Sequence, residues 1–284
     1  MSLVDQFESV FRGAERHRYA YDRPAVERVL VVCDLQQAEA DAFVKSLESF
    51  LAEVADATWR VLSDDDYGDV SELRAIVDAY DPQLIVSYRN VRYATWRWPY
   101  SLGVFLNAMT RETDYPVLVM PNPHELPEMK WSQTSTDRVM VLADHLTGDD
   151  SLVNWGARFT RPGGNLFLTH VEDDQVFERY LDVIGKLPSI DTQSAREAIQ
   201  ERLLKEPSDY IESCQAVLGK QGQLTQKVVP LVSMGHSLAD YVALIKEHGT
   251  SLLVFNTKEQ DQLALHGKAY TLAVQLRDVP ILML

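Results

Sequence analysis

Cysteine is nearly absent from this sequence, whose 284 residues contain only Cys33 and Cys214. Two distant cysteines form neither the disulfide framework of a small secreted domain nor the ligand set of a structural zinc site. Cys33 lies inside an apolar run, where cysteine behaves as a small buried hydrophobic residue. This scarcity suits a reducing compartment, so we expect a cytoplasmic protein.

Long apolar runs are also missing. No segment approaches the roughly 18 consecutive apolar residues that a membrane span needs. Residues 1–8 have neither a basic start nor an apolar signal core. Their pattern indicates a short amphipathic helix, and we assign residues 1–25 to an N-terminal helical arm. We therefore expect no membrane partner.

Basic residues are scarce relative to acidic ones. The chain has 27 Lys and Arg against 42 Asp and Glu, and its formal net charge is −15. A field of that sign repels phosphate backbones and anionic lipid surfaces. Nucleic acid is therefore not an expected partner.

What the chain does have is a series of short apolar runs, each followed by an amphipathic stretch. Continuous runs without alternation predict strands that are buried on both faces, and strands that alternate with helices predict a parallel sheet. The runs occupy residues 29–33, 83–86, 116–120, 139–143, 252–255 and 280–284.

The two halves of the chain resemble each other in the order of these elements. Residues 28–34 match 138–144, residues 73–86 match 241–254, and residues 115–118 match 279–282. The offset grows from 110 to 168 between the first two matches, so the second half gains 168 − 110 = 58 residues. That is about the size of one strand-helix unit. We attribute it to a strand at 165–171 and a long helix at 194–218, with Pro207 as a candidate break.

These matches predict two tandem copies. The first copy spans 26–121, the linker 122–136 and the second copy 137–284, because the linker region is rich in proline and poor in apolar periodicity. Four strands are expected in the first copy, at about 28–34, 57–62, 83–88 and 115–120. Five are expected in the second, at about 138–144, 165–171, 226–232, 251–256 and 279–284.

The second copy resembles the universal stress protein family. The resemblance rests on order: a strand ending in Asp144, a strand ending in His170 and Val171, a long helix, and a final Pro-Ile-Leu strand at 280–282. It covers nearly all of 137–284 and, more weakly, 26–121. It implies two tandem doubly wound parallel-sheet α/β domains of the adenine nucleotide alpha hydrolase-like fold, the first truncated by one strand-helix unit.

Many members of that family bind ATP with a Gly-x2-Gly-x9-Gly-Ser/Thr loop after the fourth strand, where glycines let the backbone approach phosphate. This sequence departs from the loop in both copies. In the second, Asn256 and Glu259 fall at the first two glycines, Gly267 remains, and Lys268 replaces the hydroxyl residue. We therefore predict no cofactor, with ATP as the alternative.

The resemblance places a candidate vestigial nucleotide cleft in the second copy. It would be lined by Asp144, His170, Val171, Gly235, Asn256, Gly267 and Lys268. Asp34 and Asp144 end equivalent strands and have two possible roles, ligand contact or capping of the local turn. A metal site at His170 lacks supporting ligand spacing, so neither metal ligands nor catalytic residues are predicted.

The loop at 88–100 is unusual because three arginines alternate with five aromatic residues in an acidic chain. Such a loop could form a binding face, or it could lie at a domain or subunit contact, where Tyr, Trp and Arg are enriched. We favour the contact and expect Trp96 and Trp98 to be buried there.

Together these features predict a stress-response or regulatory protein, not an enzyme, that acts by binding an unnamed protein partner. The alternative is an ATP-binding sensor that uses the second cleft. Each copy ends in an apolar edge strand, and such strands pair readily. We expect residues 117–120 and 281–284 to pair antiparallel within one chain, as an intramolecular pseudo-dimer, and leave open a dimer of such chains.

Overall fold

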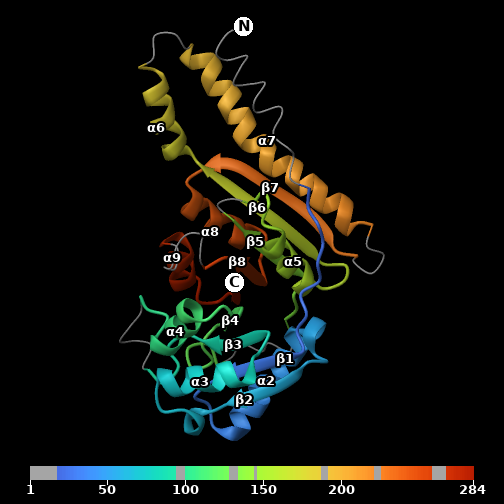
Figure 1. The fold of residues 1–284 in the computed structure, drawn as a ribbon, viewed down its shortest axis with the longest axis vertical. Helices are drawn as coiled ribbons and strands as arrows, with labels where there is room; N and C mark the ends of the chain where they lie inside the picture. Colours follow the sequence, from blue (N-terminus) through green and yellow to red (C-terminus); the bar gives the residue numbers. More distant parts are fainter. Residues whose placement is uncertain are drawn as a thin grey trace.

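Nine strands form one continuous sheet in the order β2-β1-β3-β4-β9-β8-β5-β6-β7 (Figure 1). The structure is a computed structural model that describes residues 18–93, 100–127, 134–143, 146–186, 191–220, 225–257 and 267–284. All neighbouring strands are parallel except β4 and β9. The predicted α/β class with parallel sheets is therefore confirmed.

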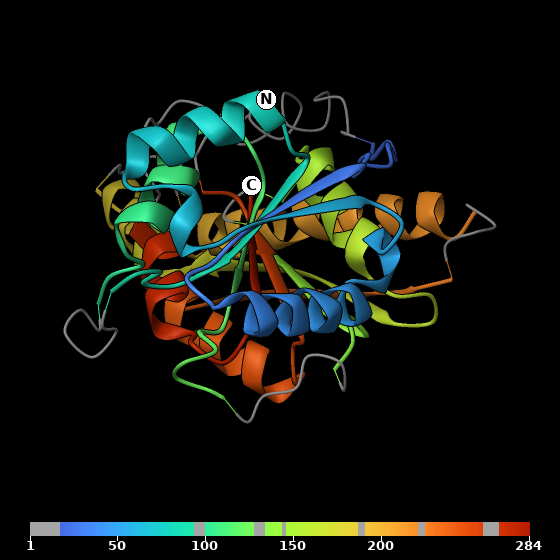
Figure 2. The ribbon, with the colours of Figure 1, turned by 90° about the horizontal axis from the view of Figure 1, so that it is seen from below.

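The first copy contributes the four expected strands. They are β1 (Arg28–Val32), β2 (Thr58–Leu62), β3 (Leu84–Tyr88) and β4 (Val117–Met120). Its helices are α2 (Gln37–Phe50), α3 (Val70–Tyr80) and α4 (Val104–Glu112), with short 3-10 turns at Ala52–Val54 and Asp64–Asp66. In Figure 2, α2 and α3 lie on opposite sides of these strands, as a doubly wound sheet requires.

The second copy contributes the five expected strands. They are β5 (Arg138–Leu142), β6 (Asn165–Asp173), β7 (Lys227–Gly235), β8 (Leu252–Phe255) and β9 (Ile281–Met283). Its helices are α5 (Asp150–Phe159), α6 (Asp174–Ile184), α7 (Thr192–Leu218), α8 (Ser237–Glu247) and α9 (Gly267–Gln275). Pro207 lies inside α7 without ending it, so the proline is not a break in the helix.

The sheet order shows which strand the first copy lacks. β6 lies beside β5 as β2 lies beside β1, and β7 is the additional edge strand next to β6. The expected extra strand at 165–171 therefore has a counterpart in the first copy, and the extra position in the sheet is that of β7. An offset in sequence reports the length of an insertion but not which strand neighbours which.

The two copies meet at their final strands. β4 pairs antiparallel with β9 through Val117↔Met283, Leu118↔Leu282 and Val119↔Ile281. This is the predicted antiparallel pairing within one chain. It covers two apolar edges that would otherwise invite pairing with other molecules.

The hydrophobic core divides by face of the sheet and not by copy. Because side chains alternate along a strand, Val29 and Val31 face one cluster and Leu30 and Val32 face the other. One cluster lies under α2, α5 and α7, and the other under α3, α4, α8 and α9. Both clusters contain residues of both copies, so burial joins the copies across the β4–β9 pair.

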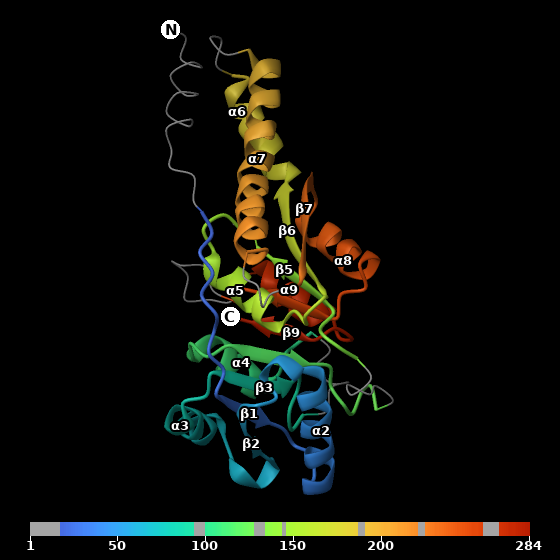
Figure 3. The same cartoon turned by 90° about the vertical axis from the view of Figure 1, so that its right-hand side faces the viewer.

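Residues 18–26 connect the copies a second time (Figure 3). The Tyr19 hydroxyl donates to Asn154 Oδ1 at 2.6 Å, and its backbone N–H donates to Ser213 Oγ at 3.1 Å. Residues 18–25, the described part of the predicted helical arm, form no helix. Their contacts to α5 and α7 favour an extended path toward β1, and residues 1–17 lie outside the described residues.

Candidate functional site

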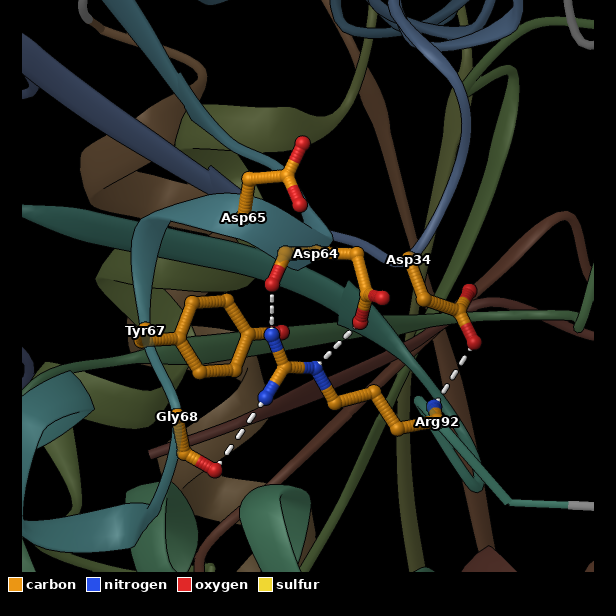
Figure 4. Close-up of a pocket in the computed structure, with 6 residues that line it drawn as sticks. All are labelled: Asp34, Asp64, Asp65, Tyr67, Gly68 and Arg92. Carbon is orange, nitrogen blue, oxygen red and sulfur yellow. Dashed lines mark hydrogen bonds and ion pairs between the residues drawn. The ribbon is translucent and has the colours of Figure 1, made fainter.

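The carboxyl ends of β1, β2 and β3 surround an open pocket in the first copy. In doubly wound sheets ligands bind at this edge, where the strand order reverses. The pocket has a volume of about 640 Å³ and is lined by loop residues that follow these three strands (Figure 4). The lining residues are Asp34, Asp64, Asp65, Tyr67, Gly68 and Arg92.

The Asp34 carboxylate is engaged by groups of its own chain. The Tyr88 hydroxyl donates to Asp34 Oδ1, and the backbone N–H of Arg92 donates to Oδ2 at 2.7 Å. The His124 ring nitrogen Nε2 lies 3.3 Å from Oδ1. Asp34 thus does not cap α2, whose preceding residue is Gln36. Besides ligand contact and capping of a local turn, Asp34 thus has a third possible role, which is to hold the loop after β3.

The Arg92 guanidinium lies in the pocket against the loop that follows β2. Its Nε is paired with the Asp64 carboxylate, and its two terminal nitrogens donate to the backbone carbonyls of Asp64 and Gly68, the latter at 3.3 Å (Figure 4). The guanidinium carbon lies 4.1 Å from the centre of the Tyr67 ring. One cation therefore meets a carboxylate, two carbonyls and an aromatic face.

Burial governs the ionisation of the two tyrosines nearest this pocket. It raises the pKa of Tyr67 and the pKa of Tyr88, and for Tyr88 the hydrogen bond to Asp34 raises the pKa further. Both hydroxyls therefore stay protonated and act as donors. Tyr88 donates to a carboxylate, and Tyr67 donates to the Cys33 carbonyl at 3.4 Å.

Arg89 follows Tyr88 and reaches the second copy. Its guanidinium donates to the carbonyls of Val274, at 3.0 Å, and Leu276, which lie at the end of α9. Burial lowers the pKa of Arg89 to about 10. This contact is of the inter-copy kind that we favoured for the loop at 88–100. Trp96 and Trp98 lie outside the described residues, so their predicted burial stays a prediction.

The equivalent edge of the second copy holds two of the predicted cleft residues, His170 and Val171. The Tyr241 hydroxyl accepts from the Val171 N–H at 3.2 Å and donates to the Ala143 carbonyl at 3.3 Å. His170 is 5% exposed and lies between the same carbonyl, at 3.3 Å, and the Glu172 carboxylate, at 3.2 Å. Asp144 lies outside the part of the chain that the structure describes.

Asn256, at the first-glycine position, has an internal partner. Its side-chain amide donates to the Asp149 carboxylate, which also accepts from the Leu152 N–H and caps α5. Burial raises the pKa of Asp149. By the register of the strands, Asn256 occupies the position that Tyr88 has in the first copy. Both positions therefore carry a polar side chain that binds an aspartate.

The remaining three predicted cleft residues lie at two element ends. Gly235 ends β7, and a Cβ there would come within 2.0 Å of an Asp240 carboxylate oxygen. Gly267 and Lys268 begin α9, and the residues between Asn256 and Gly267 are described only as far as Thr257. The structure brings His170 and Val171 together around Ala143. The pocket described above lies in the first copy and is lined by none of these residues.

Sequence reasoning missed the residues that build the pocket of the first copy. Asp64 and Tyr67 lie on the loop after β2 and Arg92 lies on the loop after β3, and nothing in the sequence marks these two loops as neighbours. One signal was available: the arginine-rich loop follows a strand that ends at the same edge as Asp34. Among the described residues, no group of three His, Cys, Asp or Glu side chains is arranged to hold a metal ion.

Comparisons with known proteins find likeness in fold and not in sequence. No protein-family model and no curated protein matches the chain. A universal stress protein from Archaeoglobus fulgidus DSM 4304 is 14% identical over 91% of this chain and 86% of that one, with a TM-score of 0.49. A protein of unknown function from Pseudomonas aeruginosa PAO1 is 11% identical over 92% and 93%, with a TM-score of 0.48. The first of these proteins is named for the family that the second copy resembles, but likenesses of this strength do not assign a function.

In the described part of the chain, no helix is both long and apolar enough to cross a membrane. The longest helix, α7, contains charged residues throughout its length.

Proposed function

We propose that this chain is a universal stress protein-like regulatory protein that acts by binding a protein partner, and that neither copy binds ATP tightly. The observation that carries the proposal is that the Asp34 carboxylate is already hydrogen-bonded to groups of its own chain. A carboxylate at the end of β1 is placed to receive a ligand's hydroxyl or amine in this fold. Here Tyr88 and the Arg92 N–H already donate to it.

The second copy supports the same proposal by a different route. The Val171 N–H, one of the predicted cleft groups, donates to Tyr241, and Asn256 is held by Asp149. Internal hydrogen bonds to these groups must be broken before a ligand can use them, and a buried group left unpaired costs about 1–3 kcal/mol. Carboxylates at both edges also oppose a triphosphate electrostatically.

The net charge adds a third line of support. A chain with 27 basic and 42 acidic side chains attracts basic surfaces and repels polyphosphates. A protein partner with a basic face suits this field, whereas nucleic acid does not. The proposal therefore assigns the regulatory role to protein contacts at the outer surface of the tandem pair.

Calorimetry tests the nucleotide half of the proposal. Titration of the full chain with ATP and Mg²⁺ is expected to show no binding tighter than about 1 mM, which corresponds to about −4 kcal/mol. The variant Tyr241→Phe, which frees the Val171 N–H, is titrated in parallel and should also stay weak because Asn256 and Asp149 remain. A micromolar dissociation constant for the unaltered chain would overturn the proposal in favour of an ATP sensor.

Mass spectrometry of the chain isolated from its own cells tests the partner half. A protein recovered in stoichiometric amount after crosslinking is the expected result. Recovery of one nucleotide per chain, with no protein, would contradict the proposal.

A further inference from the structure

The loop after β2 has the chemistry of a guanidinium site. It offers the Asp64 carboxylate, the carbonyls of Asp64 and Gly68, and the face of Tyr67. Phe105 extends the aromatic wall, with its ring centre 5.5 Å from the Arg92 guanidinium carbon. A planar cation with several N–H donors satisfies all of these groups at once, which a compact ammonium cannot do. At present Arg92 of the same chain provides that cation (Figure 4).

Contacts that do not involve Arg92 also hold this loop. Asp66 accepts from the backbone N–H of Ser63 at 2.7 Å, and the Gly68 N–H donates to Glu72 at 2.6 Å. The Tyr67 ring is 2% exposed, and its hydroxyl is bound to Cys33. These contacts, none of which involves Arg92, hold the backbone around Asp64 and Gly68 and fix the Tyr67 ring. The site is therefore preorganised, which lowers the entropy cost of binding.

Arg92 reaches this site from an unfavourable backbone conformation. Its φ is +65°, in the left-handed region that residues other than glycine rarely adopt, and Asn90 before it has a φ of +56°. The Arg92 N–H is held by Asp34, and the side chain then turns back onto Tyr67. The backbone strain opposes the side-chain contacts, which makes the arginine easier to displace than one on a relaxed strand or helix.

Solvent and ligands can approach the bound guanidinium. The pocket of about 640 Å³ lies directly beside it, and the exposed carboxylate of Asp65 lines the same space. Asp65 makes no contact with Arg92 in Figure 4, so it is free to interact with a second positive group on an incoming ligand. The surroundings favour cations and disfavour phosphates.

We infer that the pocket of the first copy is a recognition site for a guanidinium group, and that Arg92 occupies it in the absence of a ligand. The ligand class is a terminal guanidinium, presented either by an arginine side chain of a polypeptide or by a small guanidinium compound. The inference goes beyond the proposed function, because such a site can exist whether or not the second copy binds ATP.

Replacement of Arg92 opens the site for a direct test. Arg92→Gly removes the side chain and suits the positive φ, so the fold should be retained. Methylguanidine is titrated against this variant by NMR, with Tyr67 and Phe105 ring resonances as reporters. We expect saturable binding with a dissociation constant of about 1–10 mM, which is reasonable for so small a ligand. The unaltered chain should bind methylguanidine at least about tenfold more weakly, because Arg92 competes at high effective concentration.

Two neighbouring aspartates provide matched controls in the Arg92→Gly background. Asp64→Asn should weaken binding about tenfold, since a charge-assisted hydrogen bond is lost, whereas Asp65→Asn should change it by less than about twofold. Methylammonium should bind more weakly than methylguanidine. Equal binding of the two cations, equal effects of the two aspartate variants, or absence of saturation would each overturn the inference.

A pair of peptides distinguishes the two sources of the guanidinium. If a blocked Gly-Arg-Gly peptide binds more tightly than methylguanidine, the site recognises a polypeptide, and if it binds equally or more weakly, a small compound is the ligand. Should Arg92→Gly fail to fold, Arg92→Lys is titrated in its place, and the same outcomes decide.

Discussion

The carboxyl edges of the two copies have the same strand arrangement and different side-chain chemistry. In the first copy the loop after β3 folds back, so that its backbone binds Asp34 and its Arg92 side chain lines the pocket. In the second copy the corresponding groups are bound by Tyr241, which comes from α8, and by Asp149, which caps α5. The two carboxyl edges therefore have the same topology, but their polar groups are hydrogen-bonded within the chain by unrelated residues.

Strand order alone does not specify a ligand site. The sheet places backbone and side-chain groups of β1, β3, β5 and β8 at two equivalent edges. Whether these groups face a ligand depends on side chains that arrive from loops and helices elsewhere in the chain. A function inferred from topology therefore has to be checked residue by residue at the edge.

The largest expected effect tests whether the two edges belong to one cooperative structure. Leu282 pairs with Leu118 at the centre of the β4–β9 contact, and both are fully buried. Leu282→Asp buries an unpaired carboxylate and should lower the free energy of unfolding by more than about 4 kcal/mol, measured by urea denaturation. Because the core clusters span both copies, amide hydrogen exchange should accelerate in β1 as well as in β5.

Val104→Asp is the control for this prediction. Val104 is 53% exposed at the first position of α4, where an acidic residue is favourable, and its replacement should change stability by less than about 0.5 kcal/mol. Faster exchange confined to the second copy in Leu282→Asp would mean that the two copies unfold independently, as separate domains.

A matched pair of hydroxyl deletions sharpens the contrast between the edges. Tyr88→Phe removes a donor to a carboxylate, and Tyr241→Phe removes a hydroxyl that serves one N–H and one carbonyl. Hydrogen bonds to charged groups contribute more, so we expect losses of about 2 kcal/mol for Tyr88→Phe and about 1 kcal/mol for Tyr241→Phe. Urea midpoints of the two variants, measured side by side, check the order. An effect of Tyr241→Phe that exceeds that of Tyr88→Phe would contradict it.

Alkaline pH gives an effect that builds up gradually as the pH rises. Burial raises the pKa of Tyr67 and Tyr88 in the first copy, of Tyr19 in the N-terminal segment and of Tyr210 in the second copy. The protonated forms are favoured in the folded chain, so the full contribution is present below the unfolded pKa of about 10 and is lost as pH rises above it. Each such tyrosine should lower the free energy of unfolding by about 1.4 kcal/mol per pH unit.

Tyr210→Phe tests that slope in the second copy. Tyr210 donates to Asp150 at 2.6 Å. Its removal should make the free energy of unfolding less dependent on pH above about pH 10, by the contribution of one tyrosine. Denaturation at a series of alkaline pH values measures the slope for the variant and the unaltered chain. Identical slopes would show that Tyr210 ionises alike in the folded and unfolded states.

Much of the fold could be predicted because it depends on local pattern. The runs around Val29, Val139 and Leu252 are apolar at every position, which indicates strands covered on both faces, and the structure places strands there. The β4–β9 pairing followed from two apolar edge strands on one chain. The position of the extra strand did not follow, because a sequence offset does not show which strands are neighbours, although Pro230 within β7 is typical of an edge strand.

The candidate site was predictable only in part. The resemblance to the universal stress protein family pointed to His170, Val171 and Asn256, but the internal partners Tyr241 and Asp149 were not predicted. In the first copy, Asp34 was singled out, whereas its contacts to Tyr88 and Arg92 were not. Contacts of this kind join residues on separate elements, and no sequence period reports them.

By itself, the sequence determined the number and order of the strands, the two-copy arrangement and the apolar final strands, because hydrophobic periodicity and burial are properties of short segments. Only the tertiary structure decided what fills each carboxyl edge. There the outcome depends on the left-handed backbone at Arg92, on the direction in which α8 presents Tyr241, and on which polar groups meet after the chain has folded. Those are consequences of packing between distant segments, where burial requires each polar group to find a partner.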